Sequence, residues 1–89
     1  MKVTVELHGA AKDLSKNSFL EFEIIKNDSI NAIKVKLIDF IEKNFKGNEN
    51  LKKIVKNSAF CSEKNEIISE TYKINRSQKI GIIPPIGGG

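Results

Sequence analysis

The sequence predicts an α+β roll, in which one long helix packs across one face of a mixed β-sheet. Three observations support this fold class: an alternating segment at the beginning of the chain, a long stretch with helical spacing in the middle, and a short apolar segment near the end. A chain of 89 residues is long enough for one modest hydrophobic core. We therefore expect a single domain over residues 1–83, followed by an extended tail over residues 84–89.

The first part of the chain predicts a β-hairpin. Lys2–Leu7 alternates apolar and polar residues, as a half-buried strand does. Residues 8–11 interrupt this pattern, and Gly9 suits a loop or bulge. Residues 20–24 alternate again, with glutamates on the polar side. The two strands are close in sequence, so we expect them to pair antiparallel.

The middle of the chain predicts an amphipathic helix. Asp28 or Ser29 is expected to cap its first amides with a side-chain oxygen. Gly47 is expected to close its C-terminus. Apolar residues follow at spacings of three and four and form one stripe: Ile30, Ile33, Leu37, Phe40, Ile41 and Phe45.

The remaining segments complete a β-grasp arrangement. Residues 51–55 indicate one or two helical turns, and residues 59–62 and 66–69 indicate short strands around a turn at 64–65. Residues 80–83 are apolar apart from Gly81, which is typical of a buried strand. In a β-grasp sheet the first and last strands are neighbours. We therefore expect residues 3–7 to pair with residues 80–82.

Composition favours a cytoplasmic protein with a solvated surface. The net charge is +4, but the lysines are scattered and Arg76 is the single arginine, so nucleic-acid binding has little support. No apolar run could span a bilayer, and the first residues do not form a signal peptide. Cys61 is alone, so it cannot form an internal disulfide. Metal binding has no support, because there is no cluster of His and Cys.

The end of the sequence carries the candidate chemistry. Pro84 and Pro85 cannot donate to a sheet and stop the last strand. Three glycines follow Ile86, and glycine lets the main chain enter a slot too narrow for a β-carbon. Such a tail is suited to delivering the carboxylate of Gly89 into the active site of another protein. A glycine-rich end is also found on simple flexible termini.

The chain resembles a known family at both ends. Residues 79–89, KIGIIPPIGGG, are similar to the strand, diproline, aliphatic residue and closing glycines of the small sulfur-carrying subunit of molybdopterin synthase. Residues 7–14, LHGAAKDL, are similar to the small-residue turn of that ubiquitin-like family. Three departures concern the partner-facing surface: the turn over residues 75–79 is basic, Ile82 and Ile83 replace aromatics, and Gly87 replaces a small polar residue.

The resemblance implies a function in molybdenum-cofactor biosynthesis. Gly89 would be adenylated and then thiocarboxylated, and a larger catalytic synthase subunit would receive the tail and insert sulfur into a pterin precursor. A ubiquitin-activating-like enzyme would use ATP and Mg²⁺, and another protein would donate sulfur. This chain would be a non-catalytic carrier subunit that binds no cofactor itself.

Two groups of residues are expected to meet these partners. The receiving channel would hold the tail residues Pro84, Pro85, Ile86, Gly87 and Gly88. The adjoining surface would present an apolar patch and two cations facing an acidic region: Ile82, Ile83, Arg76 and Lys79.

Other interpretations remain open. The same fold could carry sulfur to a thiazole or an amino acid, act as a protein modifier joined to lysines through Gly89, or form a basic module for nucleic acid. We interpret Cys61 as a small, partly buried strand residue with no basic neighbour in sequence. His8 is expected to be solvated or capping, because no acid is adjacent to it.

Overall fold

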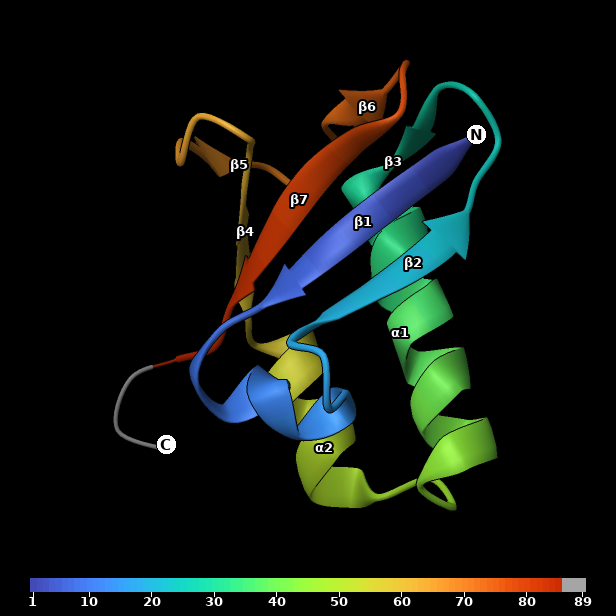
Figure 1. Cartoon of the computed structure of the whole chain (residues 1–89), viewed down its shortest axis with the longest axis vertical. Coiled ribbons are helices and arrows are strands. Elements are labelled where there is room, and N and C mark those ends of the chain that lie inside the picture. Colours follow the sequence, from blue (N-terminus) through green and yellow to red (C-terminus); the bar gives the residue numbers. More distant parts are fainter. Residues whose placement is uncertain (86–89) are drawn as a thin grey trace.

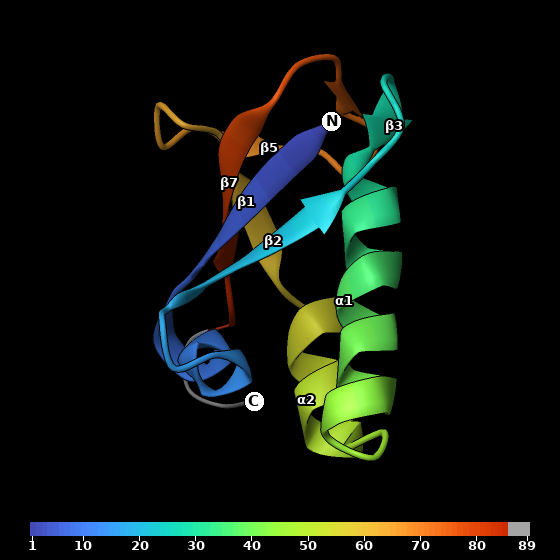
Figure 2. The same ribbon diagram turned by 45° about the vertical axis from the view of Figure 1, so that its right-hand side comes forward.

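The computed structural model describes residues 1–85. A five-stranded sheet has the order β2-β1-β7-β4-β5, and helix α1 (Ile30–Asn44) lies across one of its faces (Figures 1 and 2). The strands of this sheet are β1 (Lys2–Leu7), β2 (Phe19–Glu23), β4 (Ala59–Cys61), β5 (Ile67–Ile68) and β7 (Gln78–Ile83).

The first and last strands form the centre of the sheet. Strand β7 runs parallel to β1, with Val5 opposite Ile80 and Leu7 opposite Ile82. Strand β2 pairs with β1 antiparallel. The predicted hairpin and the predicted neighbourhood of β1 and β7 are therefore both confirmed, although β7 begins two residues earlier than expected, at Gln78.

The core lies between α1 and the sheet. The predicted apolar stripe of the helix is confirmed, because Ile33, Leu37 and Ile41 are fully buried in one cluster with the inward residues of β1 and β7. Phe40 and Phe45 are partly buried at its edge, with ring centroids 6.0 Å apart. Burial of these side chains, more than helix propensity, holds α1 in place.

The start of α1 differs from the prediction. Ser29 occupies the N-cap position, but its side chain makes no capping bond. Backbone carbonyls replace it: the amide of Ile30 donates to the oxygen of Tyr72, and the amide of Asn31 to that of Glu70, both at 3.1 Å. Strand β3 (Asp28–Ser29) pairs with β6 (Lys73–Ile74) and brings this segment beside the helix. The two-residue strands are too short to leave a sequence pattern.

The end of α1 agrees with the prediction. Gly47 has a φ of +68° and donates its amide to the oxygen of Ile41 at 3.2 Å. A second helix, α2 (Glu49–Lys56), follows where helical turns were expected. The turn between β4 and β5 is also confirmed, with Asn65 at a φ of +62°.

The segment after β1 is more regular than expected. Gly9–Leu14 forms a 3₁₀ helix, η1, in place of the predicted loop. Ala11 and Leu14 are buried, so this short helix closes one end of the core. Within residues 1–85, no helix combines the length and hydrophobicity needed to cross a bilayer.

Candidate functional site at the base of the tail

The tail begins at the end of the central strand of the sheet. Strand β7 pairs with β1 on one side and with β4 on the other, and Ile83 is the last paired residue, opposite Ala59. The sheet ends at Pro84, as predicted, because proline has no amide to donate. The predicted tail residues Ile86, Gly87, Gly88 and Gly89 lie outside the described residues. Their chemistry stays a prediction.

Pro84, the first residue of the diproline, lies close to the turn after β1. Gly9 has a φ of +53°, which glycine adopts without strain. A β-carbon built on Gly9 would lie 3.8 Å from Cγ of Pro84, in ordinary van der Waals contact. Pro84 is half-buried there, whereas Pro85 is exposed. The base of the tail therefore lies at the end of β7 and beside the start of η1.

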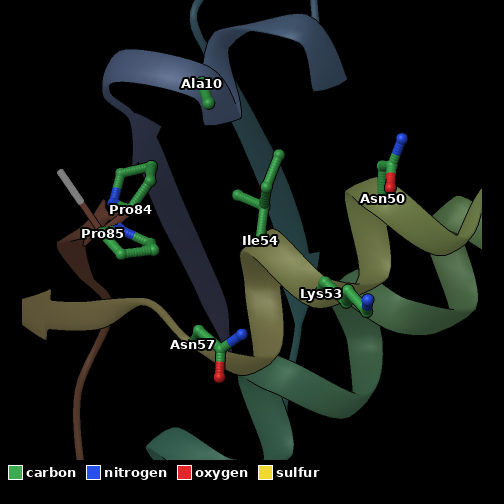
Figure 3. Close-up of a pocket in the computed structure, with 7 residues that line it drawn as sticks. All are labelled: Ala10, Asn50, Lys53, Ile54, Asn57, Pro84 and Pro85. Atoms are coloured by element: carbon green, nitrogen blue, oxygen red, sulfur yellow. The ribbon is translucent and has the colours of Figure 1, made fainter. Parts of the chain in front are cut away.

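A groove opens beside the diproline, between η1 and α2 (Figure 3). Its volume is about 290 Å³, just below the roughly 300–1,000 Å³ of typical small-molecule sites. The lining residues come from three segments that are distant in sequence, so no sequence pattern could reveal them: Ala10, Asn50, Lys53, Ile54, Asn57, Pro84 and Pro85.

The predicted apolar patch is partly wrong. Ile82 is fully buried, with 0% of its surface exposed, because it lies on the inward face of β7 opposite Leu7 and Phe60. It therefore cannot contact a partner. Ile83, on the other face, is half-buried and adjoins the diproline. Of the two predicted strand residues, only Ile83 is available at the surface.

The two predicted cations are each paired within the domain. The guanidinium of Arg76 lies 3.6 Å from the carboxylate of Glu63, and the ammonium of Lys79 lies 3.1 Å from Glu6. The hydrogen bond from Lys79, with the charges of Lys79 and His8, lowers the pKa of Glu6. The basic turn is therefore balanced locally by acids that are distant in sequence.

The expectation that His8 has no acidic neighbour is wrong. Its Nε2 lies 3.1 Å from the carboxylate of Glu6, because residues two apart share a face of a strand. Cys61 is buried in β4, which confirms its interpretation as a strand residue, but His8 is close to it in space. A β-carbon on Gly81 would lie 2.6 Å from Sγ of Cys61 and 3.3 Å from Nε2 of His8.

These side chains line a polar cleft of about 230 Å³ on the outer face of the sheet. Gly81 leaves space for the thiol of Cys61 and the imidazole of His8, which lie where its side chain would be. In the part of the chain that the structure describes, no group of three or more His, Cys, Asp or Glu residues is placed to hold a metal ion. Charged side chains are part of the lining of the cleft: Glu6, Glu63 and Lys79.

Comparisons with known proteins identify the fold. No protein-family model and no curated protein matches the sequence. Among solved structures, a protein designated molybdopterin converting factor, subunit 1, from Pyrococcus furiosus matches with a TM-score of 0.67 and 15% identity, over 96% of this chain and 98% of that one. SAMP1 from Haloferax volcanii matches with a TM-score of 0.69 and 10% identity, over the whole of both chains. The chain therefore has the ubiquitin-like β-grasp fold that these two proteins share.

Proposed function

We propose that this chain is a ubiquitin-like sulfur carrier that acts through the carboxylate of Gly89. One observation carries the proposal: the central strand of a ubiquitin-like sheet runs directly into Pro84 and Pro85, after which the sequence continues as Ile-Gly-Gly-Gly. A strand paired on both sides gives the tail a fixed base. Glycines give it a main chain narrow enough for a channel in a partner.

The proposed chemistry proceeds in three balanced steps. A carboxylate oxygen of Gly89 attacks the α-phosphorus of ATP and expels pyrophosphate, which gives a glycyl-adenylate. The terminal sulfur of a persulfide on a donor protein attacks the glycyl carbonyl carbon and expels AMP, which gives an acyl disulfide. A thiol then attacks the donor's sulfur, forms a new disulfide and releases the thiocarboxylate. Dividing one difficult substitution into easier ones is the logic of covalent catalysis.

We further propose that the sulfur acceptor is a pterin precursor and that the chain is the small subunit of molybdopterin synthase. The structural likeness to a molybdopterin converting factor subunit supports this assignment, together with the resemblance at both ends of the sequence. The partners would be a large catalytic subunit, an adenylating enzyme that uses ATP and Mg²⁺, and a sulfur donor protein. This chain's own role would be to position and present the tail.

A second candidate function is protein modification, in which Gly89 is joined to a lysine side chain of another protein. The likeness to SAMP1, a ubiquitin-like small archaeal modifier, favours it. Both candidates begin with activation of the same carboxylate. They differ in what attacks the adenylate: a persulfide sulfur or a lysine amine.

Intact mass spectrometry of the protein purified from its own host tests the proposal. We expect a species in which one oxygen at Gly89 is replaced by sulfur, and fragmentation of that species locates the change at the terminal residue. Isopeptide-linked conjugates without that species would favour the modifier. A protein in which Gly89 is followed by further residues that are never removed would contradict both candidates.

A further inference from the structure

The groove between η1 and α2 begins where the tail leaves the domain. Pro84 and Pro85 form one side of it, and Ala10 and Ile54 contribute apolar surface (Figure 3). A protein that receives the tail close to its base lies beside this groove, because the tail starts at the diproline that forms one of the groove's sides. The groove is therefore continuous with the contact that the proposed function requires.

The far side of the groove is polar and positively charged. Lys53 is exposed, and within residues 1–85 no acid forms an ion pair with it. Its neighbour Lys52 differs, since it pairs with Glu42 and Glu49. The side-chain amides of Asn50 and Asn57 flank Lys53 and offer further donors. This wall would accept a carboxylate.

We propose that the adenylating partner inserts an acidic side chain, preceded or followed by an aliphatic one, into this groove. The carboxylate would meet Lys53 and the two asparagines, and the aliphatic group would meet Ala10, Ile54 and Pro84. This inference rests on the proposed function. Anchoring the partner beside Pro85 would offset part of the entropy that the glycine tail loses when a channel orders it.

Other occupants fit the groove less well. Its volume suits one or two side chains and is small for a cofactor. The chain's own end could reach it, since four residues span roughly 13 Å. However, ordering the three glycines would cost more free energy than one exposed ion pair contributes. A partner that is already ordered avoids this cost.

The test measures ATP–pyrophosphate exchange by the adenylating enzyme of the same organism, with this chain as substrate. For Lys53→Glu we expect the KM for the chain to rise about fivefold to tenfold with little change in kcat, as loss and reversal of one surface ion pair implies. Ala10→Gln, which extends an uncharged side chain into the groove, should also raise the KM.

Lys43→Glu is the matched control. Lys43 and Lys53 both lie in the last turn of a helix, so each reversal has a similar effect on its helix dipole. Circular dichroism verifies that each variant is folded. Lys43 lies on α1, outside the groove, and its reversal should leave the KM unchanged.

The outcomes separate this inference from the proposed function. If the parent chain supports no exchange, both are wrong. If the parent supports exchange and Lys53→Glu has the parent's KM, or Lys43→Glu raises the KM equally, only the groove assignment is wrong. It is also wrong if deleting residues 86–89 shifts the NMR signals of the Asn50 and Asn57 side-chain amides, because the chain's own end would then occupy the groove.

Discussion

The carboxylate of Glu63 accepts a hydrogen bond from the backbone amide of Lys79 at 2.9 Å. Strand β4 ends at Cys61, opposite Gly81, so no strand residue is available to pair with that amide of β7. The carboxylate of Glu63 accepts this hydrogen bond in place of a strand carbonyl. The guanidinium of Arg76 lies beside the same carboxylate, at 3.6 Å. This contact closes the sheet at the start of the strand that leads to the tail.

The first prediction concerns pH. The amide of Lys79, and then Arg76, hold the pKa of Glu63 below its ordinary value of 4.5. Since the folded-state pKa is the lower one, the carboxylate stabilises the fold above the unfolded-state value and loses this effect as the pH falls through the folded-state value. Glu63→Gln should therefore lower the Tm at pH 7, and its difference from the parent should be smaller at pH 3.

Thermal unfolding at both pH values checks this, with Glu66→Gln as the control. Glu66 lies in the same turn, and no cation pairs with its side chain in the part of the chain described. Its neutralisation should leave the Tm nearly unchanged at both pH values. An equal loss for the two variants at pH 7 would mean that the contact with Lys79 has no particular role.

The second prediction compares the two helix starts. Asn48 caps α2 through a bond from the amide of Leu51 to its Oδ1, at 3.1 Å, whereas Ser29 makes no such bond. Asn48→Ala should cost about 1 kcal/mol of the free energy of unfolding. Ser29→Ala should change it by less than about 0.5 kcal/mol. Urea denaturation measures both values, and a larger loss at Ser29 would contradict the backbone capping of α1.

The third prediction concerns the hollow at Gly81. Gly81→Ala places a β-carbon too close to the thiol of Cys61, so we expect a loss of about 1–3 kcal/mol. In a Cys61→Ala background the nearer obstacle is gone and the imidazole of His8, 3.3 Å from the new β-carbon, remains, so the same substitution should cost much less. A double-mutant cycle isolates this coupling. Additive losses would show that the thiol is not what excludes a side chain at position 81.

The fourth prediction concerns the tail. Removing Gly88 and Gly89 should abolish adenylation and leave the Tm unchanged, because the core ends with β7. Gly88→Val should also block delivery with little effect on the Tm, since a β-branched residue widens and stiffens the chain. Pyrophosphate exchange measures the first loss and thiocarboxylate formation the second. Normal exchange by the shortened chain would contradict activation at Gly89.

The sequence predicted the elements with clear periodicity and missed those set by tertiary contacts. Strands β1 and β2 and helix α1 can be recognised in the sequence, because their apolar residues recur with a period of two in the strands and 3.6 in the helix. The pairing of β3 with β6 leaves no such signal, since each strand has two residues and its partner is distant in sequence. For the same reason the sequence could not show that backbone carbonyls, and not the side chain of Ser29, cap the start of α1.

In the candidate site, too, some features could be predicted from the sequence and others depend on tertiary contacts. The diproline stop could be predicted because proline lacks an amide, whatever surrounds it. The burial of Ile82 and the ion pairs of Arg76 and Lys79 depend on which face of β7 meets the helix and which acids lie across the sheet. A partner surface therefore could not be assigned from the composition of one strand.

The pairing of β7 on both sides also affects how the domain resists a force applied to its tail. A partner that draws the tail into a channel pulls along the axis of β7, which lies between the parallel strand β1 and the antiparallel strand β4. Such a force loads the ladder hydrogen bonds in shear, so many must break together, whereas a terminal edge strand could be peeled away one bond at a time. The domain can therefore be held firmly by its end and still remain folded.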